Sequence, residues 1–305
     1  MYTTLASLFP TLAPFDEWRE AQSIFNRAAT ASPSHWMLPI RACEAVGGAP
    51  ESAAQSALAV ACAHISILLV DDMLDSDPRG EYQCLGMPAA ANLASAFQSA
   101  SLSALSLGIR DASRRQAALD AFNHMYLLTA YGQFLDAQAP SDEEAYWQVV
   151  RAKSAPFFGS VFQVGALAGG AALETARRLN ILGRLYGEMI QVHDDLHDVM
   201  ESPANPDWLQ GRRPLPILFA TLVSHPQQAR FLELTSHIGE AGALEEAQDI
   251  LFQCGAVSYC VEQLLQKHQA AQALLDGLSL AQPAALAELV EAVIAPVRGL
   301  LETVQ

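Results

Sequence analysis

Residues 181–198 read ILGRLYGEMIQVHDDLHD and bring together the two patterns that decide the fold. From Ile181 onward the apolar residues recur at three- and four-residue spacing, which indicates one face of an α-helix. The same stretch ends in an acidic cluster of the form DDxxD, made of Asp194, Asp195 and Asp198. Because positions i and i+4 share a helical face, Asp194 and Asp198 are predicted to project together.

A second DDxxD ends another strongly apolar stretch, LLVDDMLD at residues 68–75. Asp71 and Asp75 share a face there, and Asp72 lies beside them. Like charges at this spacing repel by a few tenths of a kcal/mol, so a cation would stabilise the cluster. Partly hydrated oxygen ligands suit Mg²⁺, which prefers one or two carboxylates plus phosphate oxygens. A solvated helix end is the alternative for either cluster alone. If the two helices face each other, their carboxylates can hold a metal cluster bridged by a diphosphate.

The rest of the chain has the same helical spacing, and Pro and Gly mark the breaks. Segments such as residues 53–70 and 157–172 are apolar over more than one face, which is typical of helices buried inside a bundle. No run of alternating β-branched residues indicates a sheet, and no long linker divides the chain. We predict a single all-α domain over residues 1–305, with roughly ten helices.

Composition and charge exclude several classes of protein. With 51% hydrophobic and 16% charged residues, the chain is too apolar for general disorder. A net charge of −16 makes it a poor binder of nucleic acid or anionic membrane, so we expect no nucleic-acid partner. The longest apolar stretch, Ala57–Val70, is shorter than the roughly 20 residues that span a bilayer, and the N-terminus lacks signal-peptide features. Five scattered cysteines without a CxxC favour neither disulfides nor zinc. We therefore expect a soluble cytoplasmic protein without stable membrane insertion.

On these motifs the sequence resembles the isoprenyl diphosphate synthase (polyprenyl synthetase) family, the prenyltransferase branch of the class I terpene enzymes. The resemblance runs from about Ala42 to the C-terminus. Besides the two DDxxD clusters, it rests on Glu44–Gly48, His64, Gly132-Gln133 with Asp136, Lys153-Ser154, Gln191 and Asp207–Pro216. It implies a helical bundle of the isoprenoid synthase type around a deep apolar cavity, with a prenyl diphosphate substrate held by Mg²⁺ at the mouth. It also leads us to expect a homodimer.

The resemblance also implies roles for individual residues. Lys153 and Arg212 would add positive charge to the diphosphate oxygens, and Gln133, Gln191 and Ser154 would face the allylic cation. A surface lysine is the alternative for Lys153, and a hydrogen-bonded core amide is the alternative for the two glutamines. The metal ligands would be the aspartates of both motifs, which hold roughly three Mg²⁺ ions when the diphosphate is bound: Asp71, Asp72, Asp75, Asp194, Asp195 and Asp198.

Residues before the first DDxxD bear on the length of the prenyl chain. In the family, the positions four and five residues before this motif help to set the cavity floor, and here they are Ile67 and Ser66. The small Ser66 favours a chain of about C15 to C25 over C10. We interpret His193 and His197, which lie beside the second motif, as residues of the helix surface or as residues that orient the metal ligands.

The sequence departs from the family where elongating members bind isopentenyl diphosphate. Ser32 and His35 stand where a Lys and an Arg are expected, and no Lys precedes Gly86. After the first DDxxD the family usually carries two arginines, whereas this chain has only Arg79 there. His64 and Arg79 are what remains of this second substrate site. Losing two phosphate-binding cations would weaken binding by several kcal/mol, since each charge-assisted hydrogen bond contributes about 1.5–3 kcal/mol.

Three functions remain open at this point. The first is a terpene-synthase-like enzyme that ionises one allylic prenyl diphosphate, releases pyrophosphate and lets the cation cyclise, lose a proton or capture water. The second is a head-to-tail prenyltransferase of the farnesyl or geranylgeranyl type, which joins such a substrate to isopentenyl diphosphate. The third is a non-catalytic partner subunit, which would have no need of the complete set of aspartates. We predict the first, because the ionising half of the site is intact while the half that positions the second substrate is eroded.

Overall fold

The computed structural model describes residues 1–303, and the side chains of residues 1–296. Every regular element in this part of the chain is a helix, which confirms the predicted all-α bundle. The described residues form sixteen α-helices, whereas the sequence predicted roughly ten. The number is larger because several helices have only one or two turns, among them α1 (Tyr2–Leu8), α5 (Tyr82–Leu85) and α11 (Pro206–Gln210). The deep apolar cavity stays a prediction.

The chain folds into two compact units, each made of several segments. Unit 1 comprises Met1–Met125, Ser160–Ile181 and Leu278–Leu286, and unit 2 comprises Tyr126–Gly159, Leu182–Gly277 and Ala287–Gln305. Four helices have residues in both units: α7 (Ala112–Asp136), α9 (Ala155–Ala168), α10 (Leu173–Met200) and α16 (Ala284–Thr303). A single domain over residues 1–305 therefore stays a prediction.

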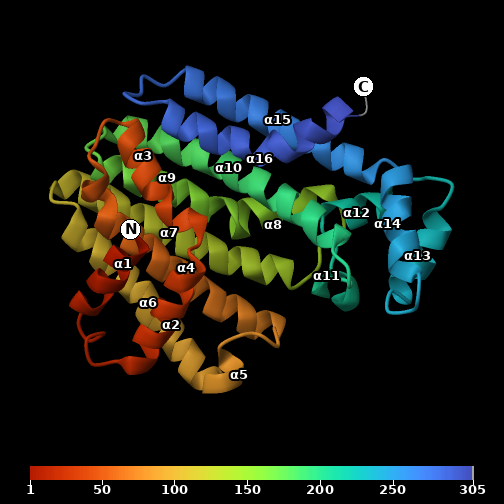
Figure 1. The fold of residues 1–305 in the computed structure, drawn as a ribbon, viewed down its shortest axis with the longest axis horizontal. Helices are drawn as coiled ribbons and strands as arrows, with labels where there is room; N and C mark the ends of the chain where they lie inside the picture. Colours follow the sequence, from red (N-terminus) through yellow and green to blue (C-terminus); the bar gives the residue numbers. More distant parts are fainter. Residues whose placement is uncertain (304–305) are drawn as a thin grey trace. The chain divides into compact units, whose positions relative to one another are not determined.

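Unit 1 is built around α4 (Ala54–Asp75), which lies beside α6 (Met87–Gly108) (Figure 1). From Ser56 to Ala63 every residue of α4 is buried, as the sequence predicted for a helix that is apolar all round. Aromatic rings extend this core, because Phe9 stacks on Phe25 at 4.3 Å and on Phe97 at 5.4 Å between ring centroids. The other elements of unit 1 are η1 (Phe9–Thr11), α2 (Arg19–Ala31), η2 (Ser34–Met37), α3 (Leu38–Ala45) and η3 (Pro50–Ala53).

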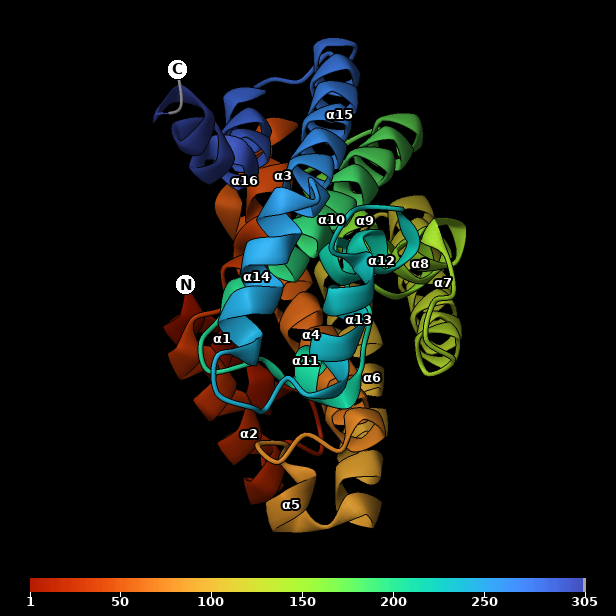
Figure 2. The ribbon, with the colours of Figure 1, turned by 90° about the vertical axis from the view of Figure 1, so that its right-hand side faces the viewer.

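Unit 2 contains a second core near the C-terminal end of α10. Helices α13 (Gln228–Ser236) and α14 (Ala243–Gln253) pack side by side (Figure 2). The largest buried side chains of this core are Trp208 and Phe231, whose ring centroids are 6.1 Å apart. The remaining helices of unit 2 are α8 (Glu143–Lys153), α12 (Leu215–Leu222) and α15 (Ala256–Asp276).

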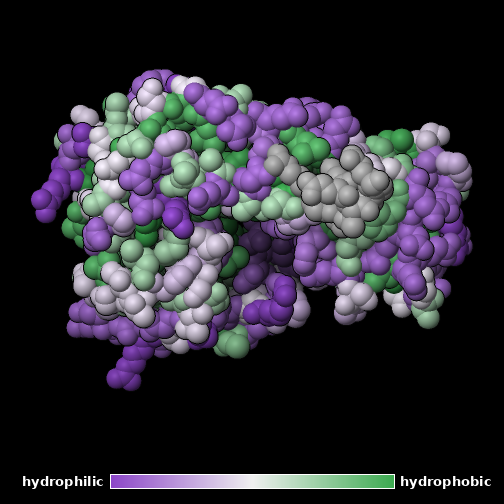
Figure 3. Space-filling view, turned by 45° about the horizontal axis from the view of Figure 1, so that its top comes forward, coloured by the Kyte–Doolittle hydropathy of each residue, from purple (hydrophilic) through white to green (hydrophobic). Residues whose placement is uncertain are grey.

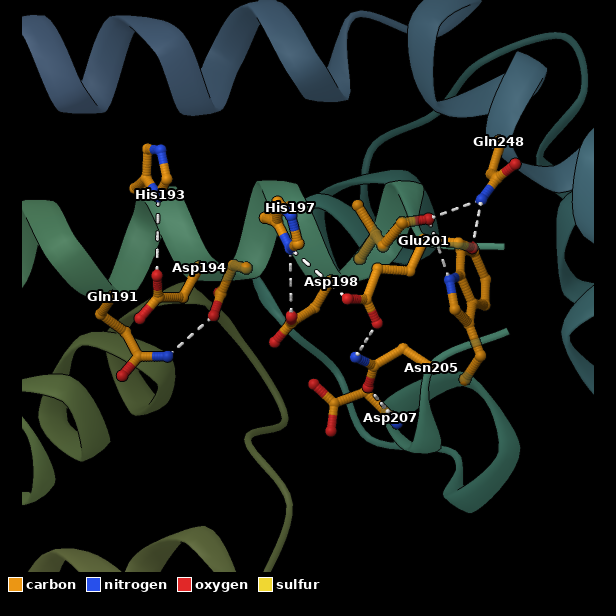
Figure 4. A network of polar contacts seen from close by, with 12 residues as sticks. Gln191, His193, Asp194, His197, Asp198, Glu201, Asn205, Asp207 and Gln248 are labelled. Atoms are coloured by element: carbon orange, nitrogen blue, oxygen red, sulfur yellow. Dashed lines mark hydrogen bonds and ion pairs between the residues drawn. The ribbon is translucent and has the colours of Figure 1, made fainter. Parts of the chain in front are cut away.

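The end of α10 is held by side chains from two other helices. The last carbonyl groups of an α-helix have no partner inside the helix and need donors from elsewhere. Here the Val199 carbonyl accepts from the Trp208 indole at 3.1 Å and from the Gln248 amide at 3.0 Å (Figure 4). The helix segment that carries the second DDxxD therefore has a fixed end.

The surface combines polar residues with a few exposed apolar ones. On the face drawn in Figure 3, hydrophilic and hydrophobic residues are interspersed. Leu127, Tyr131 and Phe134 follow one face of α7 at i, i+4 and i+7, and they are 71%, 54% and 64% exposed. One helical stretch of the described residues, Pro50–Asp75, is long and apolar enough to cross a membrane, but 67% of its most apolar window is buried inside the protein.

Candidate active site

The first acidic cluster occupies the last turns of α4, in unit 1. Asp71, Asp72 and Asp75 are all partly exposed there, and the helix ends at Asp75, because Ser76 adopts a left-handed conformation with φ of 54°. The C-terminal end of a helix carries the negative pole of its dipole, so the carboxylates raise an already negative potential. Burial, together with the charges of Asp77 and Asp71, raises the pKa of Asp72 to about 6. The cluster therefore favours a bound cation.

The loop after this cluster carries Arg79, one of the predicted substrate-binding residues. Its guanidinium pairs with Asp77 at 2.9 Å, and the Arg79 side chain is 82% exposed. Next to it, a Cβ placed on Gly80 would lie only 2.8 Å from the Cβ of Asp72, so a side chain at this position would clash. Gly80 thus lets the loop close against Asp72.

His64, the other predicted remnant of the second substrate site, belongs to an aromatic cluster in unit 1. Its Nδ1 accepts a hydrogen bond from the Trp36 indole at 3.2 Å, and its ring centroid lies 4.1 Å from that of His35. Burial lowers the pKa of His35 to about 4 and, with the added effect of His35, that of His64 to about 3. Both imidazoles are therefore neutral at pH 7 and add no positive charge.

The two residues predicted to set the length of the substrate lie in the middle of α4. Ser66 is buried, and its hydroxyl donates to the Ala94 carbonyl of α6 at 2.8 Å. Ile67 is half-buried. The Ser66 hydroxyl is thus part of the contact between α4 and α6, and its predicted role in substrate length stays a prediction.

The second acidic cluster lies on α10, in unit 2. The side chains of Asp194 and Asp198 are 58% and 37% exposed, and each lies near a histidine of the same helix (Figure 4). The pKa of Asp194 is raised by desolvation, and that of Asp198 is raised by desolvation and by the charges of Asp194 and Glu201. The neighbouring His193 and His197 oppose these shifts, and the two carboxylates offer oxygen ligands that suit a divalent cation.

Asp195 has a different environment, although it is the middle residue of the same motif. It is only 5% exposed, and its carboxylate accepts three hydrogen bonds, each of 2.8 Å. The donors are the Tyr146 hydroxyl, the Gln191 amide and the Leu215 backbone N–H. Burial raises the pKa of Asp195 to about 6, and the three hydrogen bonds oppose this shift. Both oxygens of Asp195 therefore accept hydrogen bonds inside the protein, and its role as a metal ligand stays a prediction.

Lys153, at the C-terminal end of α8, is positioned by α7. Its ammonium group pairs with Asp136 at 2.7 Å, and its side chain is 22% exposed. A Cβ on Gly132 would lie 2.3 Å from the backbone nitrogen of Lys153, so only glycine allows this approach. Lys153 and Lys267 are the only lysines of the sequence, and Lys267 pairs with Glu188 at 2.5 Å.

The remaining predicted residues of unit 2 are also joined by polar contacts. The Ser154 hydroxyl donates to Gln191 Oε1 at 2.6 Å, and Gln133 is buried. Arg212 lies 3.6 Å from the carboxylate of Asp207. Within unit 2 the structure thus links Ser154, Gln191 and Asp195 directly, whereas Lys153 and Arg212 each pair with a separate aspartate.

A group of possible ligand atoms lies at the end of the second motif. His197, Asp198 and Glu201 each offer one such atom, and these atoms lie within 4.8 Å of one another. Glu201 is oriented by Asn205, whose amide donates to Glu201 Oε2 at 2.9 Å (Figure 4). The carboxylates of this region are hard oxygen donors and fit Mg²⁺, although of the three residues only Asp198 was among the predicted ligands.

Sequence reasoning missed Tyr146, Trp36 and the Leu215 backbone N–H. Tyr146 and Leu215 lie 49 and 20 residues from Asp195 along the chain, so no local pattern connects them. One signal was available for Tyr146: its position seven residues before Lys153 places it two helical turns from that residue, on the same side of α8.

Comparison with known proteins adds to this geometry. Residues 35–291 match the family model described as polyprenyl synthetase. The chain belongs to the polyprenyl synthetase family. This family assignment confirms the resemblance identified from the motifs, and the match includes both acidic clusters.

Two archaeal relatives of this polyprenyl synthetase cover most of its length. A short chain isoprenyl diphosphate synthase from Methanothermobacter thermautotrophicus is 27% identical over 73% of each chain. A geranylgeranyl diphosphate synthase from Methanosarcina mazei is 28% identical over 72% of this chain and 71% of its own. A crystal structure of a geranylgeranyl pyrophosphate synthetase from Pyrococcus horikoshii has the same fold, with a TM-score of 0.84 over 96% of this chain and 95% of its own, at 20% identity.

Proposed function

We propose that this polyprenyl synthetase is a Mg²⁺-dependent prenyltransferase, which joins an allylic prenyl diphosphate to isopentenyl diphosphate and releases pyrophosphate. The family match over residues 35–291 carries the proposal, because it includes both acidic clusters and the Lys153 segment. The names of the two archaeal relatives, both isoprenyl diphosphate synthases, support it. This is the alternative that the sequence left open, and the comparisons favour it over terpene-synthase-like ionisation alone.

The residues of the site fit this chemistry. Exposed carboxylates of the two DDxxD motifs would hold roughly three Mg²⁺ ions, which when bound polarise the diphosphate as a leaving group. Lys153 and Arg212 would neutralise the oxygens of the departing diphosphate. The Gln191 carbonyl and the Ser154 hydroxyl would place electron density beside the allylic cation. In this structure Lys153 pairs with Asp136 and Arg212 with Asp207, and each cation has further N–H donors for a diphosphate oxygen.

The reaction can be tested with purified protein, Mg²⁺ and allylic diphosphates of about C10 to C25, each with and without isopentenyl diphosphate. We expect a diphosphate one C5 unit longer when isopentenyl diphosphate is present, and the longer substrates to be preferred. Product identification by mass spectrometry measures both. An unchanged product spectrum after addition of isopentenyl diphosphate would contradict the proposal, and no reaction in any arm would favour a partner subunit.

A second candidate is ionisation of one substrate without elongation. The observation that favours it is His35, because a buried imidazole with a lowered pKa stands there in place of a cation expected for a second diphosphate, packed against His64. In this case the allylic diphosphate alone gives pyrophosphate and a hydrocarbon or alcohol. The same experiment separates the two candidates through the effect of isopentenyl diphosphate on rate and product.

We also infer a cytoplasmic homodimer. The apolar face of α7 supports the dimer, because Leu127, Tyr131 and Phe134 would lose their exposure to water if two copies paired through it. Leu127→Asp should then shift the protein from dimer to monomer in size-exclusion chromatography with light scattering. A dimer that persists in this variant would place the interface elsewhere.

A further inference from the structure

The buried carboxylate of Asp195 connects three helices of unit 2. Its Oδ2 accepts from Tyr146 of α8 and from the backbone N–H of Leu215, the first residue of α12. Its Oδ1 accepts from Gln191, one turn earlier on α10. All three donors converge on one group, and a carboxylate, which only accepts, is the side chain that satisfies them.

We propose that Asp195 is a positioning residue, held by Tyr146 and the start of α12, that fixes which end of the Gln191 side-chain amide faces Ser154. This proposal rests on the proposed function, because Gln191 and Ser154 are the groups expected beside the allylic cation. Asp195 then differs in role from Asp194 and Asp198, the metal-binding carboxylates of the same motif.

The direction of the Gln191 amide follows from hydrogen-bond chemistry. The NH₂ group of Gln191 must face Asp195, since its carbonyl oxygen would meet an acceptor there. The carbonyl oxygen is thereby turned to the other side, where it accepts from the Ser154 hydroxyl at 2.6 Å. The electron-rich end of the amide thus lies next to Ser154, which is the orientation that stabilises a neighbouring cation.

Burial separates Asp195 from the metal-binding residues. Asp195 is 5% exposed, whereas the side chains of Asp194 and Asp198 are 58% and 37% exposed. Tyr146, its donor from α8, is also buried at 5%. A metal ion on Asp195 would have to reach a group that is enclosed by protein and already accepts three hydrogen bonds, and this costs more than binding at the exposed pair.

The substitution Asp195→Asn tests this role. The Asn side chain can still accept from Tyr146 and Leu215, but its NH₂ group then faces that of Gln191, so Gln191 must turn over. We expect kcat for pyrophosphate release to fall about 10- to 100-fold, with the KM for the allylic diphosphate and the Mg²⁺ concentration for half activation within twofold of wild type. Pyrophosphate is released whether or not the chain is elongated, so the result does not depend on which product forms.

A second substitution should restore the orientation. In Asp195→Asn combined with Gln191→Glu, the Asn amide donates to the new carboxylate, which also accepts from Ser154. The double variant should be at least about tenfold faster than Asp195→Asn, whereas Gln191→Glu alone places two carboxylates together and should be slow.

Tyr146→Phe should lower kcat less than Asp195→Asn. Tyr259→Phe is its control, because the Tyr259 hydroxyl also donates to a carboxylate of α8, that of Glu143, outside this network.

Thermal unfolding gives a readout that does not depend on turnover. Mg²⁺ with pyrophosphate should raise the Tm of Asp195→Asn as much as that of wild type, whereas Asp194→Asn should lose most of the increase. Loss of this increase in Asp195→Asn, or a Mg²⁺ requirement raised tenfold with normal kcat at saturation, would overturn the proposal. So would wild-type kcat in Asp195→Asn, or a double variant no faster than the single one.

Discussion

The two DDxxD motifs have the same pattern and lie near the C-terminal ends of two helices, yet their middle aspartates have different surroundings. Asp72 of the first motif is partly exposed, and a loop closes against it at Gly80. Asp195 of the second motif is buried and accepts three hydrogen bonds. The motif alone therefore does not determine the surroundings of its middle residue, because they depend on the element that packs against the helix.

The pKa values sharpen this contrast. The pKa of each of the two aspartates is raised to about 6, and burial is the largest cause for both. For Asp72 the neighbouring charges of Asp77 and Asp71 add to the increase, whereas for Asp195 three hydrogen bonds reduce it. A bound cation would therefore lower the pKa of Asp72, while Asp195 already has the polar contacts that compensate its charge.

The largest expected effect comes from the first aspartate of each motif. Asp71→Asn or Asp194→Asn should reduce turnover by at least about 10³-fold, because metal binding contributes several kcal/mol to stabilising the leaving group. Helical content, followed by circular dichroism, should stay unchanged. Asp120→Asn, in the exposed part of α7, is the control and should remain active. Full activity of either motif variant would remove that motif from the metal site.

The cations beside the two motifs should differ in their importance. Lys153→Met should lower kcat/KM about 10- to 100-fold, because a partly buried ammonium group that binds diphosphate contributes about 1.5–3 kcal/mol. Arg79→Met should cost less than about tenfold, since Arg79 is 82% exposed and paired with Asp77. Steady-state kinetics at saturating Mg²⁺ measure both. A larger loss for Arg79 would show that the loop after α4 binds the diphosphate.

The raised pKa of Asp195 predicts a dependence of stability on pH. Its pKa of about 6 in the folded protein lies above the usual 3.8, so the folded state binds more protons than the unfolded state between these values. The free energy of unfolding should therefore fall as pH rises, with Asp195 contributing a loss of roughly 2 kcal/mol between pH 4.5 and 7.5. Urea unfolding of wild type and Asp195→Asn at both pH values isolates this contribution. Equal pH dependence of the two proteins would disprove it.

The smallest expected effect concerns the packing of the helix behind the first motif. Ser66→Ala should lower the free energy of unfolding by about 1 kcal/mol, because it removes the hydrogen bond to the Ala94 carbonyl. Ser99→Ala, on the exposed side of α6, is the matched control and should change stability by less. Product analysis of the same variant tests the predicted role of Ser66 in substrate length. A shift to longer products without loss of stability would show that Ser66 contacts the prenyl chain.

Much of the fold could be predicted from local sequence, and much of the site could not. Spacing of apolar residues revealed α10 and the buried α4, because helical periodicity is a local property. The motifs identified the acidic residues and Lys153 for the same reason. One donor to Asp195 is Tyr146, 49 residues away, and the acceptor for Ser66 is a backbone carbonyl of another helix. Such contacts depend on how helices pack, and no local pattern specifies them.

The scarcity of lysine has a practical consequence for proteolysis. A protease that cleaves only after lysine finds two sites in the whole sequence, after Lys153 and Lys267, both in helices of unit 2. Both side chains are ion-paired and about one-fifth exposed, so cleavage requires local opening of α8 or α15. Unit 1 contains no such site in Met1–Met125, Ser160–Ile181 or Leu278–Leu286. The rate of cutting therefore reports the opening of unit 2 alone, without any engineered change to the chain.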